Sequence, residues 1–569
     1  MQHTGTHSET ASVGRPVIAS PALVWGDLLS AAQLRTLALA VFIGLSLVVR
    51  CLHLDAYGLS EDETNKLRAV ASYRQLDFSA NAEHPMVMKL AMFASMQTAG
   101  AWNAIAPGLH APTISDETAL RLPNAIAGSL LTGIIFLLCE LLFGLPTAIW
   151  ASLFWALDVN AAAINRIGKE DTFLLLFLLL GAYFYERAKV QARLHGDAEG
   201  AQRWYARSGG AFGLMLASKY MPHYFGLHAL FAVAARDPHA GPKRARFFRA
   251  MGAAFLIANF ALVLPATWSY LQGYVHGNMQ SHTGYYFAQR IYANAISFSP
   301  FGTPIWFYLA ALVTKIPLVP LVLMVLGLVQ MFVHRRERGM VFLRVFLFFA
   351  LIPYSFVASK FLRYLLPVFA MLDIVAAVGV VWLLGFLRRL LEQRTGRGTT
   401  WSLWRPSIAM VAIVVASVLD PLSALVSSAP FYSLHQNALA ARFFTPGMLF
   451  PDDEFYDAGV REAVTDLARV AQPGAVIASD ATNVVQVYLD RLGRSDLRSV
   501  SLSQNQFASV DAPEIWVLAQ DAHTYFENQA TLKQLRAGGA PIREYVVGGG
   551  VAVQVFQYPR QVNLQAAGL

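Results

Sequence analysis

Long apolar runs recur along the 569-residue chain, and they constrain its fold more than any other feature. Residues 36–52, 121–143 and 361–386, for example, contain no more than two charged side chains each. A helix that crosses the hydrocarbon core of a bilayer needs about 20 such residues. Only 14% of the whole chain is charged, against about 25% in soluble domains. The chain is therefore predicted to be a polytopic α-helical membrane protein, which excludes a disordered chain, a coiled coil and an ordinary soluble enzyme.

The apolar runs predict about eleven membrane crossings. One run, residues 209–235, lies between two basic stretches but is too short for two full spans. We therefore predict a pair of short helices or a re-entrant hairpin there, with its turn at residues 218–223. The predicted segments are, in chain order, residues 36–52, 121–143, 146–167, 172–185, 209–235, 251–270, 305–333, 341–357, 361–386 and 406–426.

The distribution of charge predicts the topology of the chain. The formal net charge is +8, which in a soluble protein would suggest a nucleic-acid partner. Here the basic residues gather between apolar segments, at 187–207, 236–249, 334–338 and 388–397. The positive-inside rule assigns such loops to the cytoplasm, and the acidic first loop, residues 54–120, to the outer face. We expect no nucleic-acid partner, a cytoplasmic N-terminus and an extracytoplasmic C-terminus.

Composition divides the chain into three predicted parts. Residues 1–33 form a polar, disordered cytoplasmic tail, residues 34–426 form the transmembrane domain, and residues 427–569 form an extracytoplasmic domain. Strand-like and helix-like runs alternate in the last part, which is typical of a small α/β domain. The predicted strands are residues 475–478, 515–519 and 545–555, and the predicted helices are residues 457–470 and 530–537.

Three consecutive carboxylates, Glu61, Asp62 and Glu63, follow the first apolar segment. Just outside a membrane, such residues supply a general base or a cation ligand. Ser60 and Glu63 also have the spacing of a capping box, and acids favour the first turn of a helix, so a purely structural role stays open. A second acidic pair, at residues 116–117, repeats the pattern before the second segment.

Other charged side chains lie close to the predicted outer face. Glu83, His84 and Lys89 occupy the first outer loop, either as the start of a helix at Pro85 or as groups that face an anionic headgroup. Lys219 lies in the turn of the short hairpin. Irregular backbone at membrane depth is tolerated only where it is buried in protein or lines a cavity, so this position predicts that Lys219 lies near a site.

Several remaining groups have a plainer default interpretation. The charged turn at residues 166–171 is most simply an ordinary polar connection, and Lys360 and Arg363 are expected to extend to the membrane interface. His276 and His282 lack the spacing of metal ligands, so we expect no metal site. No nucleotide-binding or other cofactor motif occurs in a suitable context, and we expect no cofactor.

Acidic residues on the outer face above scattered cations at membrane depth suggest one kind of chemistry. Cations can hold a phosphate and stabilise the charge that develops when it leaves. A carboxylate can take a proton from an acceptor hydroxyl or amine. The pattern therefore favours transfer of a group from an amphiphilic phosphate.

Six short motifs occur in order between residues 36 and 390. They are Asp62-Glu63-Thr64, Glu83-His84-Pro85 followed by Lys89, Arg121-Leu122-Pro123, the turn at 165–171 with Arg166 and Asp171, Ser218-Lys219-Tyr220, and the segment 360–367 with Arg363-Tyr364. In this order they resemble motifs of the GT-C class of polytopic glycosyltransferases. The resemblance is to the protein O-mannosyltransferases and the lipid A aminoarabinose transferases, which are glycosyltransferase families 39 and 83.

The resemblance implies a GT-C fold and an inverting transfer of a sugar from a polyprenyl-phosphate donor to an acceptor on the outer face. It implies that Asp62 is the catalytic carboxylate, with Glu63 beside it. The chain departs from the family where His84 precedes a single proline and where Gly168-Lys169-Glu170 replaces a more apolar stretch. The residues that it implies for binding the phosphate or sugar of the donor are Glu83, His84, Lys89, Arg166, Asp171, Lys219, Arg363 and Tyr364.

A transporter or flippase of lipid-linked sugars is the alternative function, and a scaffold that binds lipid headgroups without turnover is a third. Transporters often show paired repeats and ionisable groups near the middle of the membrane. No repeat stands out here, and most of the carboxylates lie in outer loops, which favours the enzyme. The expected partners are the donor, an acceptor protein, lipid or glycan, and membrane lipids, in a bacterial inner membrane.

Overall fold

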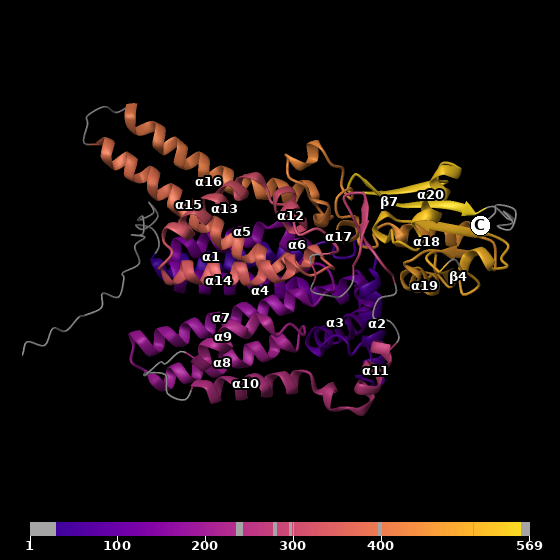
Figure 1. Ribbon diagram of the computed structural model, residues 1–569, viewed down its shortest axis with the longest axis horizontal. Coiled ribbons are helices and arrows are strands. Elements are labelled where there is room, and N and C mark those ends of the chain that lie inside the picture. Colours follow the sequence, from indigo (N-terminus) through magenta and orange to yellow (C-terminus); the bar gives the residue numbers. More distant parts are fainter. Residues whose placement is uncertain are drawn as a thin grey trace, which may run out of the picture.

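The computed structural model describes residues 30–234, 243–276, 282–294, 299, 301–395, 401–504 and 506–558. Long helices run side by side through most of the molecule, and a small domain with a β-sheet lies at one end of them (Figure 1). The predicted fold class, a helical polytopic membrane protein with a C-terminal α/β domain, is confirmed. Of the predicted tail, residues 1–29 lie outside the described residues.

The predicted apolar segments are helical over most of their length. Five described helices are long and apolar enough to cross a membrane, and α5 and α6 form a sixth span if the two, bent by 59°, are taken together. The larger predicted number of crossings stays a prediction. The helices are α1 (Ala31–Cys51), α4 (Asp116–Phe143), α5 (Leu145–Leu157), α6 (Val159–Asn165), α7 (Asp171–Leu194), α8 (Ala198–Leu216), α9 (His223–Ala234), α10 (Lys243–Ala258), α11 (Pro265–His276), α12 (Phe307–Lys315), α13 (Leu318–Val333), α14 (Arg338–Ser355), α15 (Leu366–Thr395) and α16 (Trp401–Ser428).

Three predicted segments are interrupted, where continuous spans were expected. Asp158 ends α5 and caps α6, because its carboxylate accepts the backbone N–H of Asn160 at 2.8 Å. Pro317, which has no N–H to donate, separates α12 from α13. The predicted segment 251–270 is split between α10, a short 3₁₀ helix and α11. Polar caps and prolines end these helices where the apolar pattern alone continues.

The predicted hairpin has its turn where the sequence places it, because α8 ends at Leu216 and α9 begins at His223. The basic stretch 187–207 was expected to be a loop, but it belongs to the ends of α7 and α8 apart from a three-residue connection. Amphipathic helices can carry basic side chains on a solvated face, so charge alone did not mark a loop.

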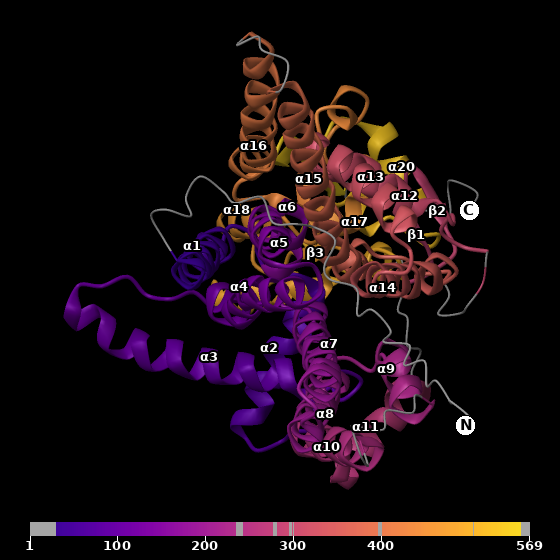
Figure 2. The ribbon, with the colours of Figure 1, turned by 90° about the vertical axis from the view of Figure 1, so that its left-hand side faces the viewer.

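The first outer loop is more regular than its polar composition suggests. It contains α2 (Glu61–Arg74) and α3 (Met86–Ile105). Seen along the helix bundle, α3 lies across the other helices (Figure 2).

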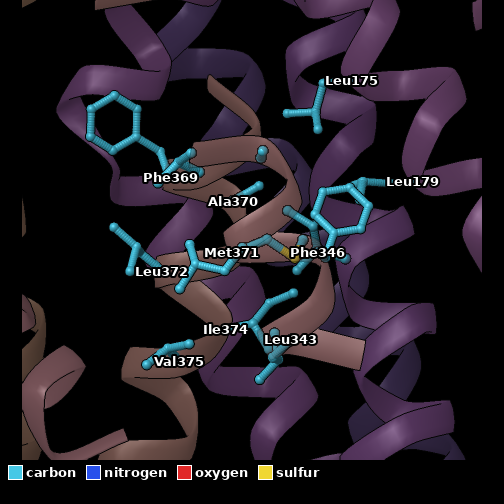
Figure 3. Packing of buried hydrophobic residues seen from close by; sticks show 14 of the residues in the cluster. Leu175, Leu179, Leu343, Phe346, Phe369, Ala370, Met371, Leu372, Ile374 and Val375 are labelled. Atoms are coloured by element: carbon cyan, nitrogen blue, oxygen red, sulfur yellow. The ribbon is translucent and has the colours of Figure 1, made fainter. Parts of the chain in front are cut away.

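Helix α15 is the centre of the hydrophobic core. More than three quarters of its apolar window, 78%, is buried inside the protein. Met371 and Ile374 of α15 pack toward Leu175 of α7 and Phe346 of α14 (Figure 3). Against α13 the approach is closer, because buried Gly327 and Gly379 lie where the two backbones meet. Small residues allow such backbone contact between membrane helices.

The C-terminal domain is built on a five-stranded sheet in the order β4-β3-β5-β7-β6. Strands β3, β4 and β5 are parallel, and β7 pairs antiparallel with β5 and β6. The predicted single strand 545–555 is wrong, because Gly548 and Gly549 adopt positive φ and turn the chain into a hairpin. The elements are β3 (Val476–Ala478), β4 (Arg498–Val500), β5 (Ile515–Ala519), β6 (Arg543–Val547), β7 (Gly550–Tyr558), α17 (Pro451–Phe455), α18 (Val460–Val470), α19 (Thr482–Arg491) and α20 (Gln529–Gly538).

The glycine contact between α13 and α15 makes a testable prediction. A β-carbon at Gly379 would overlap the carbonyl oxygen of Leu323, whereas a β-carbon at Gly385, on the same helix, meets open space. We expect Gly379→Ala to lower the free energy of unfolding by about 1–3 kcal/mol. Gly385→Ala should leave it unchanged or raise it slightly, since alanine favours helix. Thermal unfolding of the purified protein in detergent measures both, and equal stabilities would contradict the close packing.

Candidate active site

Asp62 is a partly exposed carboxylate of the acidic cluster. It lies in the first turn of α2, its side chain is 43% exposed, and it forms an ion pair with the ammonium group of Lys169. Lys169 comes from the turn between α6 and α7 and is almost fully buried. Burial lowers the pKa of Lys169 to about 7, while the carboxylates of Glu170 and Asp171 act in the opposite direction. A carboxylate open to solvent thus stands against a buried cation.

Glu63, the neighbouring residue, points inward and is fully buried. Both of its oxygens bind the guanidinium of Arg121, at 2.8 and 2.6 Å. Its oxygens also accept the backbone N–H groups of Gly168 at 2.8 Å and Ser60 at 3.0 Å. Four hydrogen bonds occupy the carboxylate, so Glu63 holds α2 in place and is not free to exchange a proton. The structural role left open by the capping-box spacing fits Glu63, and the adjacent Asp62 is the group that stays available.

A second buried ion pair lies beside Asp62. Lys66, one turn further along α2, places its ammonium 3.0 Å from Glu170, and both side chains are almost fully buried. The ring of His84 approaches the same oxygen of Glu170, with Nδ1 at 3.4 Å. Burial lowers the pKa of His84, while the Glu170 carboxylate acts in the opposite direction. Lys66 was not singled out from the sequence, although its position four residues after Asp62 puts the two on one helix face.

Asp171, Lys219, Arg363 and Tyr364 come together from three distant segments. The ammonium of Lys219 binds the Asp171 carboxylate at 2.6 Å, and Nε of Arg363 lies 3.9 Å from its other oxygen. Lys219 also lies over the ring of Tyr364, 4.6 Å from its centre. Burial alone would lower the pKa of Lys219, but Asp171 raises it above its ordinary value. Two cations therefore share a single carboxylate, which leaves positive charge available for an anion.

Three candidates bind backbone or neighbouring loop groups instead of the Asp62 cluster. Arg166 donates to the carbonyl oxygens of Leu52 at 2.5 Å and His53 at 2.7 Å, and so caps the end of α1. Lys89 donates to the carbonyl oxygen of Asn81 at 2.5 Å, and burial lowers its pKa to about 7. Glu83 accepts the side-chain amide of Asn81 at 2.6 Å. In this arrangement Lys89 and Glu83 close the loop before α3.

Two expectations for the charged residues are corrected. Lys360 does not extend to the membrane interface, because it is 1% exposed and donates to the carbonyl oxygens of Thr303 and Val357, each at 2.6 Å. Arg363 is likewise held inside, over the ring of Phe361. The acidic pair 116–117 binds Arg491 of α19, so it anchors the C-terminal domain. Two of these partners, Thr303 and Arg491, lie far along the chain from the residues that they contact.

The C-terminal region supplies residues that the sequence did not single out. Asp453 of α17 accepts the Tyr285 hydroxyl at 2.5 Å, and Glu454 forms a buried ion pair with Lys315, which ends α12. Asp457 follows closely in the sequence, and its carboxylate accepts the backbone N–H of Glu61 at 2.7 Å. The segment Pro451–Phe455 contains three acidic residues in succession. This pattern is the sequence feature that could have identified the region as a candidate.

Asp457 is part of a short chain of contacts that ends at α2. Its other oxygen lies 2.7 Å from Nε2 of His523, whose Nδ1 lies 2.9 Å from the Tyr525 hydroxyl. Burial alone would lower the pKa of His523, but the Asp457 carboxylate raises it to about 10. The charged pair therefore caps the first turn of the helix that carries Asp62.

The raised pKa of His523 predicts a pH-dependent contribution to stability. The contribution is complete below about pH 6.5, the ordinary pKa of histidine, and is lost as the pH rises toward 10. We expect His523→Gln to lower the free energy of unfolding by about 3 kcal/mol at pH 6 and by much less at pH 10. Thermal unfolding across this range measures the difference, with His276→Gln, an exposed histidine, as control. A loss that does not vary with pH would contradict the charged pair.

The geometry combines an accessible carboxylate with buried cations at the same end of the helices. Asp62 can accept a proton, and Lys169, Lys219 and Arg363 can bind an anionic group near it. Such a centre suits a reaction in which a phosphate leaves as an acceptor loses a proton.

One known protein family is similar to the middle of the helical part of the chain. A family model described as dolichyl-phosphate-mannose-protein mannosyltransferase matches residues 110–268, which include Arg121, the turn at 165–171 and Lys219. A comparison with curated protein sequences gives no match.

Two solved structures are similar over most of the chain. ArnT from Cupriavidus metallidurans, bound to undecaprenyl phosphate, is 13% identical, with a TM-score of 0.49, over 91% of this chain and 97% of that chain. The archaeal oligosaccharyltransferase AglB from Archaeoglobus fulgidus, in complex with an inhibitory peptide and a dolichol-phosphate, is 10% identical, with a TM-score of 0.49, over 95% of this chain and 76% of that chain. The match to the family model confirms the resemblance of this chain to the protein O-mannosyltransferase group of GT-C glycosyltransferases.

Proposed function

We propose that this protein is an inverting glycosyltransferase that moves a sugar from a polyprenyl-phosphate donor to an acceptor on the extracytoplasmic face. The observation that carries the proposal is the different environment of two adjacent acids. The carboxylate of Glu63 is buried in an ion pair with Arg121, whereas the carboxylate of Asp62 is partly exposed beside Lys169. The description of the matching family, a mannosyltransferase that uses a dolichyl-phosphate sugar, supports the same reaction class.

In the proposed reaction Asp62 acts as the general base. It takes the proton of the acceptor hydroxyl or amine, and the acceptor atom bonds to the anomeric carbon on the face opposite the phosphate. The bond between that carbon and the phosphate oxygen breaks, which inverts the configuration and releases polyprenyl phosphate. Lys219 and Arg363 stabilise the charge of the leaving phosphate. Lys169, buried against Asp62, holds the base in its ionised form until the acceptor arrives.

An apolar cavity beside the centre supports a lipid donor. It has a volume of about 430 Å³ and lies between α3, α4 and α7. Ala91, Leu122, Ile126 and Phe173 are among its lining residues, and Phe173 is two residues from Asp171. We propose that the isoprenoid part of the donor uses this surface, since each methylene removed from water contributes about 0.8 kcal/mol.

We propose that the chain resides in a bacterial inner membrane with the Asp62 centre on the outer side. The basic ends of α7, α13 and α14 lie away from that centre along the helices, which agrees with a cytoplasmic position for them. Residues 34–426 then form the catalytic domain, and residues 427–569 form the extracytoplasmic domain that completes it through Asp453 and Asp457.

Turnover by an Asp62 variant tests the proposal. We expect Asp62→Asn to lower the release of polyprenyl phosphate from a polyprenyl-phosphate sugar by about 10²–10⁴-fold, because the amide cannot accept the acceptor's proton. The measurement uses purified full-length protein in detergent with donors that carry different sugars and with candidate acceptors.

Two further variants separate catalysis from folding. Asp55→Asn removes an exposed carboxylate from the same outer loop and should keep full activity. Glu63→Gln should lower thermal stability, because it breaks the buried pair with Arg121. Equal turnover by wild type and Asp62→Asn would remove Asp62 from its role, and movement of the lipid across the membrane without sugar transfer would favour the transporter.

A further inference from the structure

A second cluster of charge, centred on a buried acid, lies far from Asp62, at the other end of α7. Glu186 of α7 is almost fully buried. It lies 15 residues after Asp171 on one helix, which corresponds to about 22 Å at 1.5 Å per residue. Its carboxylate binds Lys189 at 2.7 Å and Arg338, the first residue of α14. Two cations therefore surround a single acid, as they do at Asp171.

These charges line a cavity of about 200 Å³ between α7, α9 and α14. Leu227, Phe342 and Phe346 contribute apolar wall. Val341 and Val345 also line it, and each is 40% exposed, so the cavity reaches the outside of the helix bundle. The cavity therefore combines charged side chains with apolar side chains, and this combination suits an amphiphilic ligand.

His228 also lines this cavity, and one nitrogen of its ring has no hydrogen-bond partner among the described residues. The residue is 7% exposed, and its Nδ1 atom is buried without a hydrogen bond. Its ring packs edge-on against Tyr185, with centroids 5.1 Å apart. Leaving a buried polar group unsatisfied is unfavourable, so a ligand that accepts its hydrogen would stabilise the site.

We propose that this cavity binds the phosphate headgroup of an anionic lipid from the cytoplasmic leaflet. The cluster of Lys189, Arg338 and Glu186 has a net charge of +1, which complements a phosphodiester. The Nδ1–H group of His228 donates to a phosphate oxygen, and the acyl chains lie along Val341 and Val345. Basic pockets between membrane helices on the cytoplasmic side are suited to such headgroups.

The sign of the charge change tests the proposal. Lys189→Gln lowers the net charge of the cavity to zero and should weaken binding of phosphatidylglycerol about fivefold. Glu186→Gln raises the net charge and should strengthen binding by a similar factor. Arg336→Gln is the matched control, because Arg336 is an exposed cation of the same connection between α13 and α14. Native mass spectrometry of the delipidated full-length protein, titrated with lipid, measures binding independently of sugar transfer.

His228→Phe separates ligand binding from packing. Phenylalanine keeps the ring against Tyr185 and removes the unsatisfied nitrogen, so thermal stability without lipid should hold or rise while phosphatidylglycerol binding falls. If Lys189→Gln and His228→Phe both bind lipid like Arg336→Gln, the proposal fails. It also fails if phosphatidylcholine binds as well as phosphatidylglycerol. Polyprenyl phosphate is titrated in parallel, and stronger binding of this lipid with the same response to the variants would identify it as the source of the phosphate.

Discussion

The buried pair of Glu63 and Arg121 is the interaction on which the Asp62 centre depends. Taking two charges out of water is costly, and such a pair persists only when the remaining donors and acceptors are satisfied. Here all five N–H groups of Arg121 are used, two by Glu63 and three by the carbonyl oxygens of Leu54, Tyr57 and Gly58. The carboxylate in turn binds Gly168. One ion pair thereby joins α2, α4, the segment that follows α1 and the turn that carries Lys169.

The ion pair of Glu63 and Arg121 also explains why the adjacent acids Asp62 and Glu63 have different environments. Successive residues of a helix point about 100° apart, so fixing Glu63 toward Arg121 directs Asp62 to the accessible side. The charged side chains around Asp62 form three ion pairs, which are Lys169 with Asp62, Lys66 with Glu170, and Lys219 with Asp171. Each acid has a cation beside it, which limits the electrostatic cost of gathering many charges near a membrane.

Local patterns predicted much of this arrangement, and long-range partners account for the rest. The apolar runs predicted most of the helices, the capping-box spacing predicted the start of α2, and the hairpin turn at Lys219 was placed correctly. The partners of the charged side chains could not be predicted from local patterns. For example, nothing near Arg166 in the sequence indicates that its guanidinium caps α1. Lys360 was misjudged for the same reason, and the contribution of the C-terminal region was missed, since Asp457 meets Glu61 across almost 400 residues.

The contacts that residues 453–457 make with earlier parts of the chain have a consequence for the timing of synthesis. Lys315, Tyr285 and the first turn of α2 receive their partners only from this late part of the chain. His523, which completes the cap on α2 through Asp457, is made later still. While the ribosome is still producing the C-terminal domain, the helices that bear Asp62 are already present but lack these contacts. An unfinished chain therefore lacks these contacts around Asp62, and the arrangement seen in the structure forms only when the last part of the chain has folded against the helices.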